Sequence, residues 1–290
     1  MGRTHHLKQT LLQNIHDSTG PGAPDVEFVV VDYNSRDGLK EWILTEPELQ
    51  PFLESDVLKY ARYPEATSFH HAHAKNMAHR LATGDFLCNL DADNFLGYGF
   101  ASRLAQNFGR DSDALVLPDL SLTRHTPVEE RGFYGRIAMS AKNFLKLGGY
   151  DEDRRGWGGE DTDLILRALS SGMKADPFSE KSFMQVVGHT HAERVANLRH
   201  EDVTTAVKRI EDSRAPPTLA TRLVNLGMTF GTLARTQKNR DGHIGAGMVE
   251  LGCGEIRHAI GAVRIGPAPP SHAVTGYVRY KVLNLAGVGV

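Results

Sequence analysis

The stretch Gly84-Asp85-Phe86-Leu87-Cys88-Asn89-Leu90-Asp91-Ala92-Asp93-Asn94 decides the fold that this sequence predicts. Its apolar run, residues 86–90, is bounded by polar residues and indicates a short strand buried on both faces of a parallel sheet. Ligands of open α/β sheets bind beyond the carboxyl ends of the strands, where Asp91 and Asp93 are expected. Because Mg²⁺ and Mn²⁺ prefer carboxylate and phosphate oxygens, these two side chains predict a metal bridge to a diphosphate. A plain polar turn is the alternative interpretation.

The segments around this stretch alternate between helical and strand patterns. Apolar residues recur at helical spacing in residues 7–15, 39–44 and 72–81, whereas residues 26–31 and 57–63 have strand patterns. Residues 26–31 run into a polar loop that contains Asp32 and Asn34. The order predicts an α/β fold with a mostly parallel central sheet and helices on both of its faces.

The pattern continues in the second half of the chain. Residues 98–108 indicate a helix, while residues 114–117, 137–139 and 183–187 indicate strands. Ser140 is expected to cap a helix that ends at Gly148-Gly149. Beyond residue 201 a charged helix and a Pro-rich linker are expected, and the remaining residues contain no motif with an evident chemistry.

A second dense stretch is Gly156-Trp157-Gly158-Gly159-Glu160-Asp161-Thr162-Asp163, followed by a helix with one apolar face. Acidic residues in a first helical turn favour the helix dipole, so capping alone would explain Asp161 or Asp163. Capping does not explain the preceding glycines and tryptophan. They suggest a loop that lets backbone and indole approach a ligand closely.

Histidines are the other candidate metal ligands. His189 and His191 follow the apolar residues 183–187, where they would ligate a metal or form a polar surface. The earlier group at positions 70, 71, 73 and 79 is compatible with a solvated helix face, and no carboxylate or cysteine pattern accompanies it. Of the two groups, the later pair is the better candidate for metal binding, and a polar surface stays the alternative interpretation for it.

Composition limits the class of protein. The chain has 290 residues, 40% of them hydrophobic and 23% charged, which is typical of one large α/β domain or a domain with an appendage. Its net charge of −2 argues against general nucleic-acid binding, although the basic residues 203–290 would permit peripheral contact with phosphates or an anionic surface. Two cysteines give neither a disulfide framework nor a zinc site. With no apolar run long enough to span a membrane and no leader, we expect a cytoplasmic protein.

Three ordered stretches resemble GT-A-fold glycosyltransferases of the family-2 type, with a later segment like that of galactosyl- and N-acetylgalactosaminyltransferases. The stretches, within residues 3–200, are Val29 to Ser35, Ala74-Lys75-Asn76 with Leu81 to Asp93, and Gly156 to Asp161. The resemblance implies a nucleotide-sugar donor, with a UDP-sugar favoured, an acceptor hydroxyl on a glycan, glycoconjugate or small molecule, and a Mn²⁺ or Mg²⁺ cofactor.

The resemblance also implies a role for each matched residue. Asp32 and Asn34 would hold the base and ribose, and Asp91 and Asp93 would meet the ribose and the metal-bound diphosphate. A histidine on a later strand would complete the metal shell, with His189 preferred to His191. The remaining expected donor-site residues are Lys75, Asn76, Trp157, Gly158 and Gly159.

The expected chemistry is an inverting, single-displacement transfer. Glu160 and Asp161 match acceptor-binding and base carboxylates, and Asp161 is the expected base. A nucleotidyltransferase is a competing interpretation, but the Gly-rich phosphate loop that it requires does not follow the first strand. A catalytically silent sugar-nucleotide-binding protein is a second alternative, although it would not need both Glu160 and Asp161.

The domain organisation carries one further expectation. Residues 1–200 are predicted to form the GT-A domain and residues 201–290 a helical or irregular extension of unknown role. The apolar strand that opens such domains is expected to be missing, through a late start site or a gene-calling error. Residues 282–290 are the only evident segment that would replace it.

Overall fold

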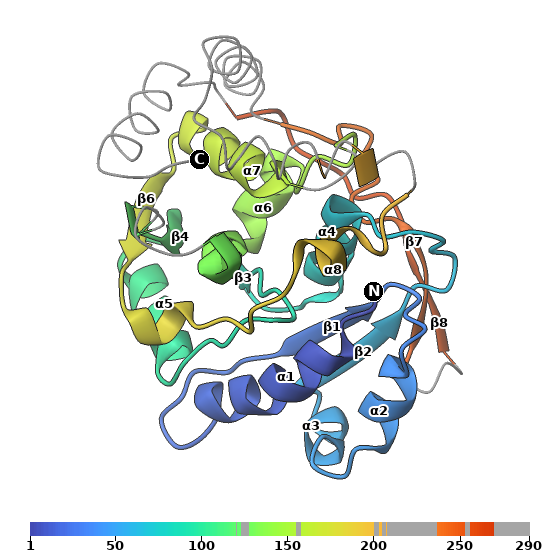
Figure 1. The fold of residues 1–290 in the computed structure, drawn as a ribbon. Coiled ribbons are helices and arrows are strands. Elements are labelled where there is room, and N and C mark those ends of the chain that lie inside the picture. The colour runs from blue at the N-terminus through green and yellow to red at the C-terminus, as the bar shows by residue number, and fades with distance from the viewer. Residues whose placement is uncertain are drawn as a thin grey trace.

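The structure is a computed structural model that describes residues 1–119, 121–122, 128–154, 158–199, 203–204, 207, 237–252 and 256–269. Its helices and strands alternate through most of this range (Figure 1). The helices are α1 (Thr4–Ser18), α2 (Leu39–Thr45), α3 (Gln50–Glu54), α4 (His71–Leu81), α5 (Phe100–Arg110), α6 (Ala141–Leu147), α7 (Glu160–Ser170) and α8 (His191–Val195), with 3₁₀ turns η2 (Val128–Gly135) and η3 (Lys181–Met184). The strands are β1 (Phe28–Asp32), β2 (Leu58–Arg62), β3 (Phe86–Cys88), β4 (Ala114–Pro118), β5 (Ala138–Ser140), β6 (Lys174–Phe178), β7 (Gly247–Leu251) and β8 (Ile256–Ile260).

The described strands form two four-stranded sheets, in the orders β1-β2-β7-β8 and β3-β5-β4-β6. Only the pairs β1–β2 and β4–β6 are parallel, and the other pairs are antiparallel. The α/β class is confirmed, but a mostly parallel sheet was the wrong expectation. A short apolar run has the same pattern beside a parallel or an antiparallel neighbour, so the sequence carried no information about direction.

Strand β3 differs from its prediction in the same way. It lies at the edge of its sheet and pairs antiparallel with β5. Phe86 is 42% exposed, so β3 is not buried on both faces. Its ring stacks on Phe108 of α5 instead, with 4.1 Å between the ring centroids.

Two later segments also differ from their predictions. Residues 183–187 are not a strand, because η3 ends at Met184 and only an isolated antiparallel bridge joins Val186 to Asn94. Within residues 201–290, β7 and β8 are strands that extend the sheet of β1 and β2 (Figure 1), so this part is not only helical or irregular. Residues 282–290 lie outside the described residues, and the prediction of a further strand stays a prediction.

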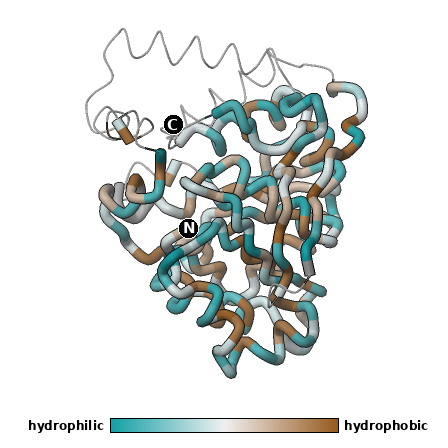
Figure 2. The backbone as a smooth tube through the Cα atoms, turned by 90° about the vertical axis from the view of Figure 1, so that its right-hand side faces the viewer, coloured by the Kyte–Doolittle hydropathy of each residue, from teal (hydrophilic) through white to brown (hydrophobic). Residues whose placement is uncertain are grey.

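Helix α6 forms as its sequence predicts. The Ser140 hydroxyl accepts a hydrogen bond from the backbone N–H of Asn143, and Gly148 ends the helix with φ 78°. One buried cluster packs α6 and α7 against β3, β4 and β5, and another packs α1 and α2 against β1 and β2. Hydrophobic and hydrophilic stretches therefore alternate along the backbone (Figure 2), because most elements bury only one face.

Gly148 also lies against the segment that leads to β7. A Cβ atom at this position would overlap the backbone carbonyl of Lys238, and its φ disfavours any side chain. We expect Gly148→Ala to lower the free energy of unfolding by about 2–4 kcal/mol, measured by denaturant titration. Gly109→Ala in α5 is the matched control, since nothing lies within 4 Å of its added Cβ. Equal stability of the two variants would contradict the packing of the 237–252 segment.

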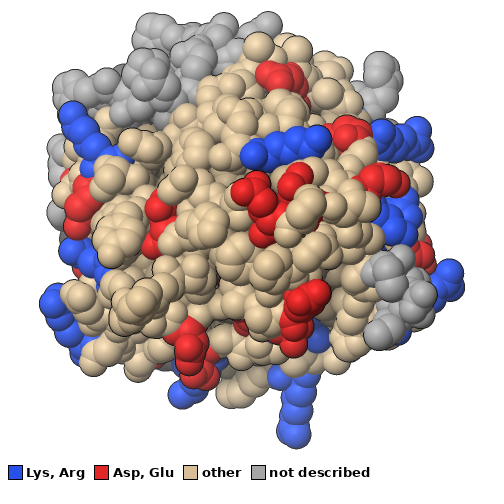
Figure 3. Space-filling model, turned by 90° about the horizontal axis from the view of Figure 1, so that it is seen from below, with Lys and Arg blue, Asp and Glu red and all other residues tan. Residues whose placement is uncertain are grey.

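Helix hydropathy and surface charge bear on contact with membranes and anionic surfaces. None of the described helices combines the length and the apolar character that crossing a membrane requires. On the face shown in Figure 3, acidic and basic side chains are interspersed, and neither sign covers a continuous area. Most of the basic C-terminal part lies outside the described residues, so its contact with an anionic surface stays a prediction.

Candidate active site

The strand-end carboxylates are held by a network that starts at β3. Asn89 follows the strand, and its side-chain amide donates to Asp91 Oδ1 (3.2 Å) and to the carbonyl of Gly135 (2.9 Å). The second carboxylate, that of Asp93, is held by Asn94, whose side-chain amide donates to Asp93 Oδ1 at 2.8 Å. Arg136 in turn donates to Asn94 Oδ1 at 2.8 Å. Side-chain hydrogen bonds therefore fix the turn formed by residues 91–94, which is not a freely solvated loop.

His189 is brought to this turn by the segment that follows η3. The backbone N–H of Val187 donates to the carbonyl of Asp93 at 2.7 Å, which places the His189 ring two residues further on. Its Nδ1 lies 3.2 Å from Asp93 Oδ2, and the two side chains are only 8% and 11% exposed. The predicted pairing of His189 with Asp93 therefore exists in space, whereas the His191 side chain lies outside what the structure describes.

This pair fits a divalent cation. Burial, and then the neighbouring charge of Asp91, raise the pKa of Asp93, because an isolated buried carboxylate is poorly solvated. A cation bound between Asp93 and His189 would remove that cost. A carboxylate oxygen and an imidazole nitrogen about 3 Å apart match neighbouring ligands of one metal ion.

The second group of carboxylates begins α7. Lys75 of α4 donates to Asp161 Oδ1 at 2.7 Å and to Glu160 Oε1 at 3.1 Å. Burial raises the pKa of Asp161 to about 7 despite the charge of Lys75, and the charge of Glu160 adds to the increase. Burial also acts to raise the pKa of Glu160, but Lys75 and His71 lower it to about 2. The net shift of the pKa is therefore upward for Asp161 and downward for Glu160, although burial acts in the same direction on both.

Helix α7 is anchored by a buried ion pair. Asp163 accepts a hydrogen bond from Arg167 Nε at 2.7 Å, and neither side chain is exposed. The same guanidinium donates to the carbonyls of Leu147 and Gly149, which tie α7 to the end of α6. This contact, and not helix capping, accounts for Asp163. Gly159 begins the helix with φ 93° and Gly158 precedes it with φ 84°, while Trp157 lies outside the described residues.

Gly135 lies between the two carboxylate groups. A Cβ atom added to it would be 3.1 Å from Asp161 Oδ2, 3.1 Å from Asp91 Oδ2 and 3.5 Å from the Asn89 amide nitrogen. The carboxylates of Asp91 and Asp161 therefore face one another across a glycine. The space that a side chain would fill stays open between them.

Filling this space should impair the site without unfolding the protein. We expect Gly135→Ala to lower kcat/KM at least tenfold, because displacements near 1 Å cost up to about 10²-fold. Gly132→Ala in the same 3₁₀ turn is the control, since its Cβ would make an ordinary 3.5 Å contact with Val186. Both variants should melt close to the wild-type temperature. Full activity of Gly135→Ala would show that the space between the carboxylates is not used.

Two of the predicted nucleotide-binding residues, Asp32 and Asn34, lie at the end of β1 and in the loop that follows it. Asp32 is fully buried and accepts hydrogen bonds from the Ser35 backbone N–H (2.6 Å) and the Tyr60 hydroxyl (2.8 Å). Asn34, in a left-handed conformation with φ 55°, lies beside a cavity of about 380 Å³. The residues lining that cavity are Met1, Gly2, Asn34, Arg36, Asp37, Ala66, Thr67, Ala196, Asn197 and Leu198.

Asn76 has a different place from the one predicted. Its side chain is fully buried and makes three hydrogen bonds, to both backbone groups of Tyr150 and to the carboxylate of Glu152. These bonds use both polar atoms of the amide and hold the segment that leads toward α7. Lys75, its neighbour, reaches the site but contacts carboxylates.

Two residues of the site were missed by the sequence reasoning. His71 begins α4, has a lowered pKa because it is buried, and feels the charges of Glu160, Lys75 and Asp91. Arg136 is 1% exposed, and its Nε and Nη1 have no hydrogen-bond partner among the described residues. A basic residue directly before the apolar run 137–139 was the available signal for Arg136. His71 was set aside with the other histidines near it.

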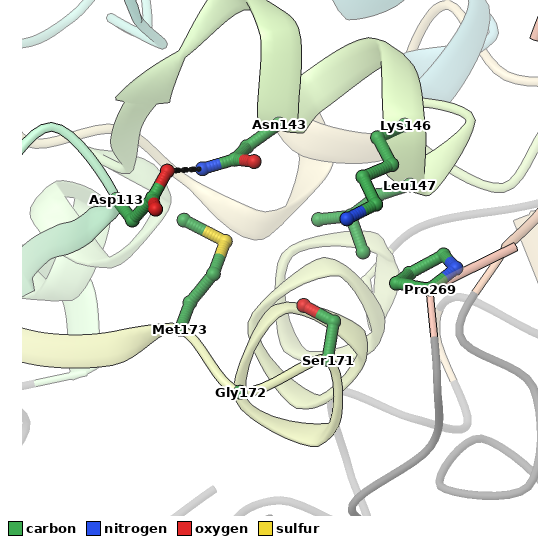
Figure 4. Close-up of a pocket in the computed structure, with 8 residues that line it drawn as sticks. All are labelled: Asp113, Asn143, Lys146, Leu147, Ser171, Gly172, Met173 and Pro269. Atoms are coloured by element: carbon green, nitrogen blue, oxygen red, sulfur yellow. Dashed lines mark hydrogen bonds between the residues drawn. The ribbon is translucent and has the colours of Figure 1, made fainter. Parts of the chain in front are cut away.

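A second, smaller cavity of about 140 Å³ contains none of the predicted site residues. It lies between α6, the end of α7 and Pro269 (Figure 4), where Asp113 accepts a hydrogen bond from Asn143 at 2.9 Å. Its volume is below the range of about 300–1,000 Å³ that is usual for small-molecule sites.

Comparison with known proteins gives the family. Residues 4–149, half of the chain, match the model described as glycosyl transferase family 2. Residues 124–201 match a second model, described as N-terminal domain of galactosyltransferase. The chain therefore belongs to glycosyl transferase family 2, and the GT-A class expected from the sequence is confirmed.

One solved structure that matches part of this chain is a crystal structure of GalNAc-T7 with UDP, GalNAc and Mn²⁺. It is 18% identical with a TM-score of 0.41, and the match covers 52% of this chain and 35% of that one. The match thus spans about a third of the length of that protein.

Proposed function

We propose that this protein transfers a sugar from a nucleotide-diphosphate donor to an acceptor hydroxyl. The observation that carries the proposal is the convergence on Gly135 of two carboxylates with different surroundings. Asp91 lies two positions before Asp93, which contacts His189. Asp161, on the other side of Gly135, has a pKa raised to about 7 by burial. A carboxyl group whose pKa is raised toward neutral pH by burial is suited to act as a general base.

Asp161 is the proposed base. Its Oδ1 is engaged by Lys75, which leaves Oδ2, the atom that faces Gly135, to accept the proton of the acceptor hydroxyl. The acceptor oxygen then forms a bond to the sugar C1 as the bond from C1 to the diphosphate oxygen breaks. The electron pair of that bond leaves with the diphosphate, and the proton stays on Asp161. Attack opposite to the leaving group inverts the configuration at C1.

A divalent cation, Mn²⁺ or Mg²⁺, held by Asp93 and His189 with Asp91 beside them, would neutralise the charge on the departing diphosphate. Arg136 is buried next to these carboxylates, and its Nε and Nη1, which have no partner in the described part of the chain, are in a position to support the same region. The cavity beside Asn34 is the proposed place for the base and ribose. The galactosyltransferase model that matches residues 124–201 supports a hexosyl donor such as a galactosyl nucleotide, and a UDP-sugar is the proposed form.

Product formation from a panel of UDP- and GDP-sugars, with Mn²⁺, Mg²⁺ or EDTA, tests the proposal. We expect divalent-dependent release of the nucleotide diphosphate and a glycosylated acceptor. Tight donor binding without product under any condition would favour a silent binding protein. Release of pyrophosphate would instead favour a nucleotidyltransferase.

A further inference from the structure

Three metal-ligating side chains gather outside the proposed active site. His5 and His6 lie in the first turn of α1, and Glu193 lies in the first turn of α8. One ligand atom from each lies within 4.8 Å of the others, and His5 Nε2 is 3.4 Å from Glu193 Oε1. Residues almost 190 positions apart in the sequence thus present two imidazoles and a carboxylate to one point. No sequence motif indicates this cluster.

The carboxylate is held in the required direction. Its Oε2 accepts hydrogen bonds from the Thr190 backbone N–H (2.7 Å) and the Thr190 hydroxyl (2.8 Å), as part of a capping box. Oε1, the other oxygen, is the one that faces His5. Because the capping box fixes the carboxylate, little side-chain entropy would remain to be lost when Oε1 binds an ion.

We propose that His5, His6 and Glu193 form a second metal site that takes a borderline transition-metal dication such as Zn²⁺. Two imidazoles and one carboxylate suit zinc, whose ligands are typically four and include water when the protein supplies three. The site differs in preference from the proposed catalytic one, where carboxylate and phosphate oxygens favour Mn²⁺ or Mg²⁺. A bound ion would join α1 to α8.

The second site borders the first. The rings of His6 and His189 pack edge to face, with 5.7 Å between their centroids, and His6 is 1% exposed. An ion at the second site would fix the His6 ring and thereby restrict the His189 ring that packs against it. Its role would therefore be to position His189, not to take part in the transfer.

Arg3 is the competing occupant. Its Nη1 lies 3.5 Å from His6 Nδ1, and its Nη2 donates to the carbonyl of Glu193 at 3.2 Å. A guanidinium this close repels a dication, so metal binding requires Arg3 to turn away from His6. Removing the charge with Arg3→Gln should therefore strengthen metal binding. This increase is the opposite of what the loss of a structural contact would cause.

Calorimetric titration of the untagged full chain with Zn²⁺ alone tests the proposal. The Asp93→Ala background silences the proposed catalytic site, so one zinc site should remain. We expect His5→Ala and Glu193→Gln to weaken it at least tenfold, Arg3→Gln to tighten it, and His258→Ala on β8 to leave it unchanged. Substituted Co²⁺ should give a visible spectrum that is lost in the same two variants.

The outcomes separate cleanly from those for sugar transfer, because binding is measured without donor or acceptor. Zinc affinity that is equal in His5→Ala, Glu193→Gln and His258→Ala would overturn the second site. So would the absence of a zinc site in the Asp93→Ala background when Asp93→Ala and the wild type melt at similar temperatures.

Discussion

Replacing Asp161 with Asn should lower turnover by about 10²–10⁴-fold and leave donor affinity unchanged. Asn keeps the shape of the side chain and can still accept the hydrogen bond from Lys75, but it cannot take a proton from the acceptor. Steady-state kinetics with the true acceptor, together with calorimetry of donor binding, would measure both quantities.

The pH dependence gives this prediction a second readout. Burial, with the charge of Glu160 beside it, raises the pKa of Asp161 to about 7, and only the deprotonated form can act as a base. Activity limited by this group should therefore fall about tenfold per pH unit below 7 and reach a plateau above it. In Asp161→Asn, the residual rate should lose this inflection.

Asp153→Asn is the matched control, because Asp153 is an exposed carboxylate in the segment before α7. It should retain wild-type turnover. Melting temperatures should show that Asp161→Asn remains folded, since Lys75 keeps its contact with Glu160. Wild-type turnover in Asp161→Asn would mean that Asp161 serves only to begin α7.

The sequence predicted those parts of the site that depend on local pattern. An apolar run that ends in Asp91-Ala92-Asp93, and a Gly-Gly pair before Glu160-Asp161, are local patterns that folding preserves. His189 lies 3.2 Å from Asp93, although the interval before it is a 3₁₀ turn and a bridge instead of a strand, and the preference for it over His191 stays a prediction. The position of His189 in the sequence brought it near Asp93, even though the strand predicted for residues 183–187 does not form.

Long-range pairing could not be predicted in the same way. The antiparallel return of β5 beside β3, and the addition of β7 to β2, involve partners whose separation in sequence has no local signature. Gly135 illustrates the limit most clearly. Its importance comes from Asp91 and Asp161 lying on either side of it, and neither is near it in sequence.

Some side chains fulfil a different need from the one their motif suggests. Asn76 was grouped with donor-binding residues, but folding uses its amide to satisfy the backbone of Tyr150. A buried polar group must find partners, and the nearest strong donors and acceptors were those of the chain itself. Roles inferred from resemblance therefore need the hydrogen-bond pattern before they can be assigned to a ligand.

Replacing Asp93 with Ala should abolish divalent-dependent nucleotide binding. Even partners outside the first ligand shell typically cost about 10–100-fold in metal affinity when removed, so loss of a direct ligand should cost more. Calorimetric titration with UDP and GDP in the presence of Mn²⁺ should give the weak affinity that the wild type shows with EDTA. Asp85→Ala, an exposed carboxylate at the opposite end of β3, should bind as the wild type does.

The effect of Asp93→Ala on stability has a definite sign when no metal is present. Because burial and Asp91 raise the folded-state pKa of Asp93, the ionised form is disfavoured by folding, and this destabilisation grows as pH rises above the unfolded value. The variant should then melt at or above the wild-type temperature at pH 8. The difference should shrink toward acidic pH, where both states hold the proton.

Addition of Mn²⁺ should reverse the order of the two melting temperatures, because only the wild type would gain stability from binding. A variant that melts lower at pH 8 without metal, and binds nucleotide as well as the wild type with Mn²⁺, would make Asp93 a structural residue.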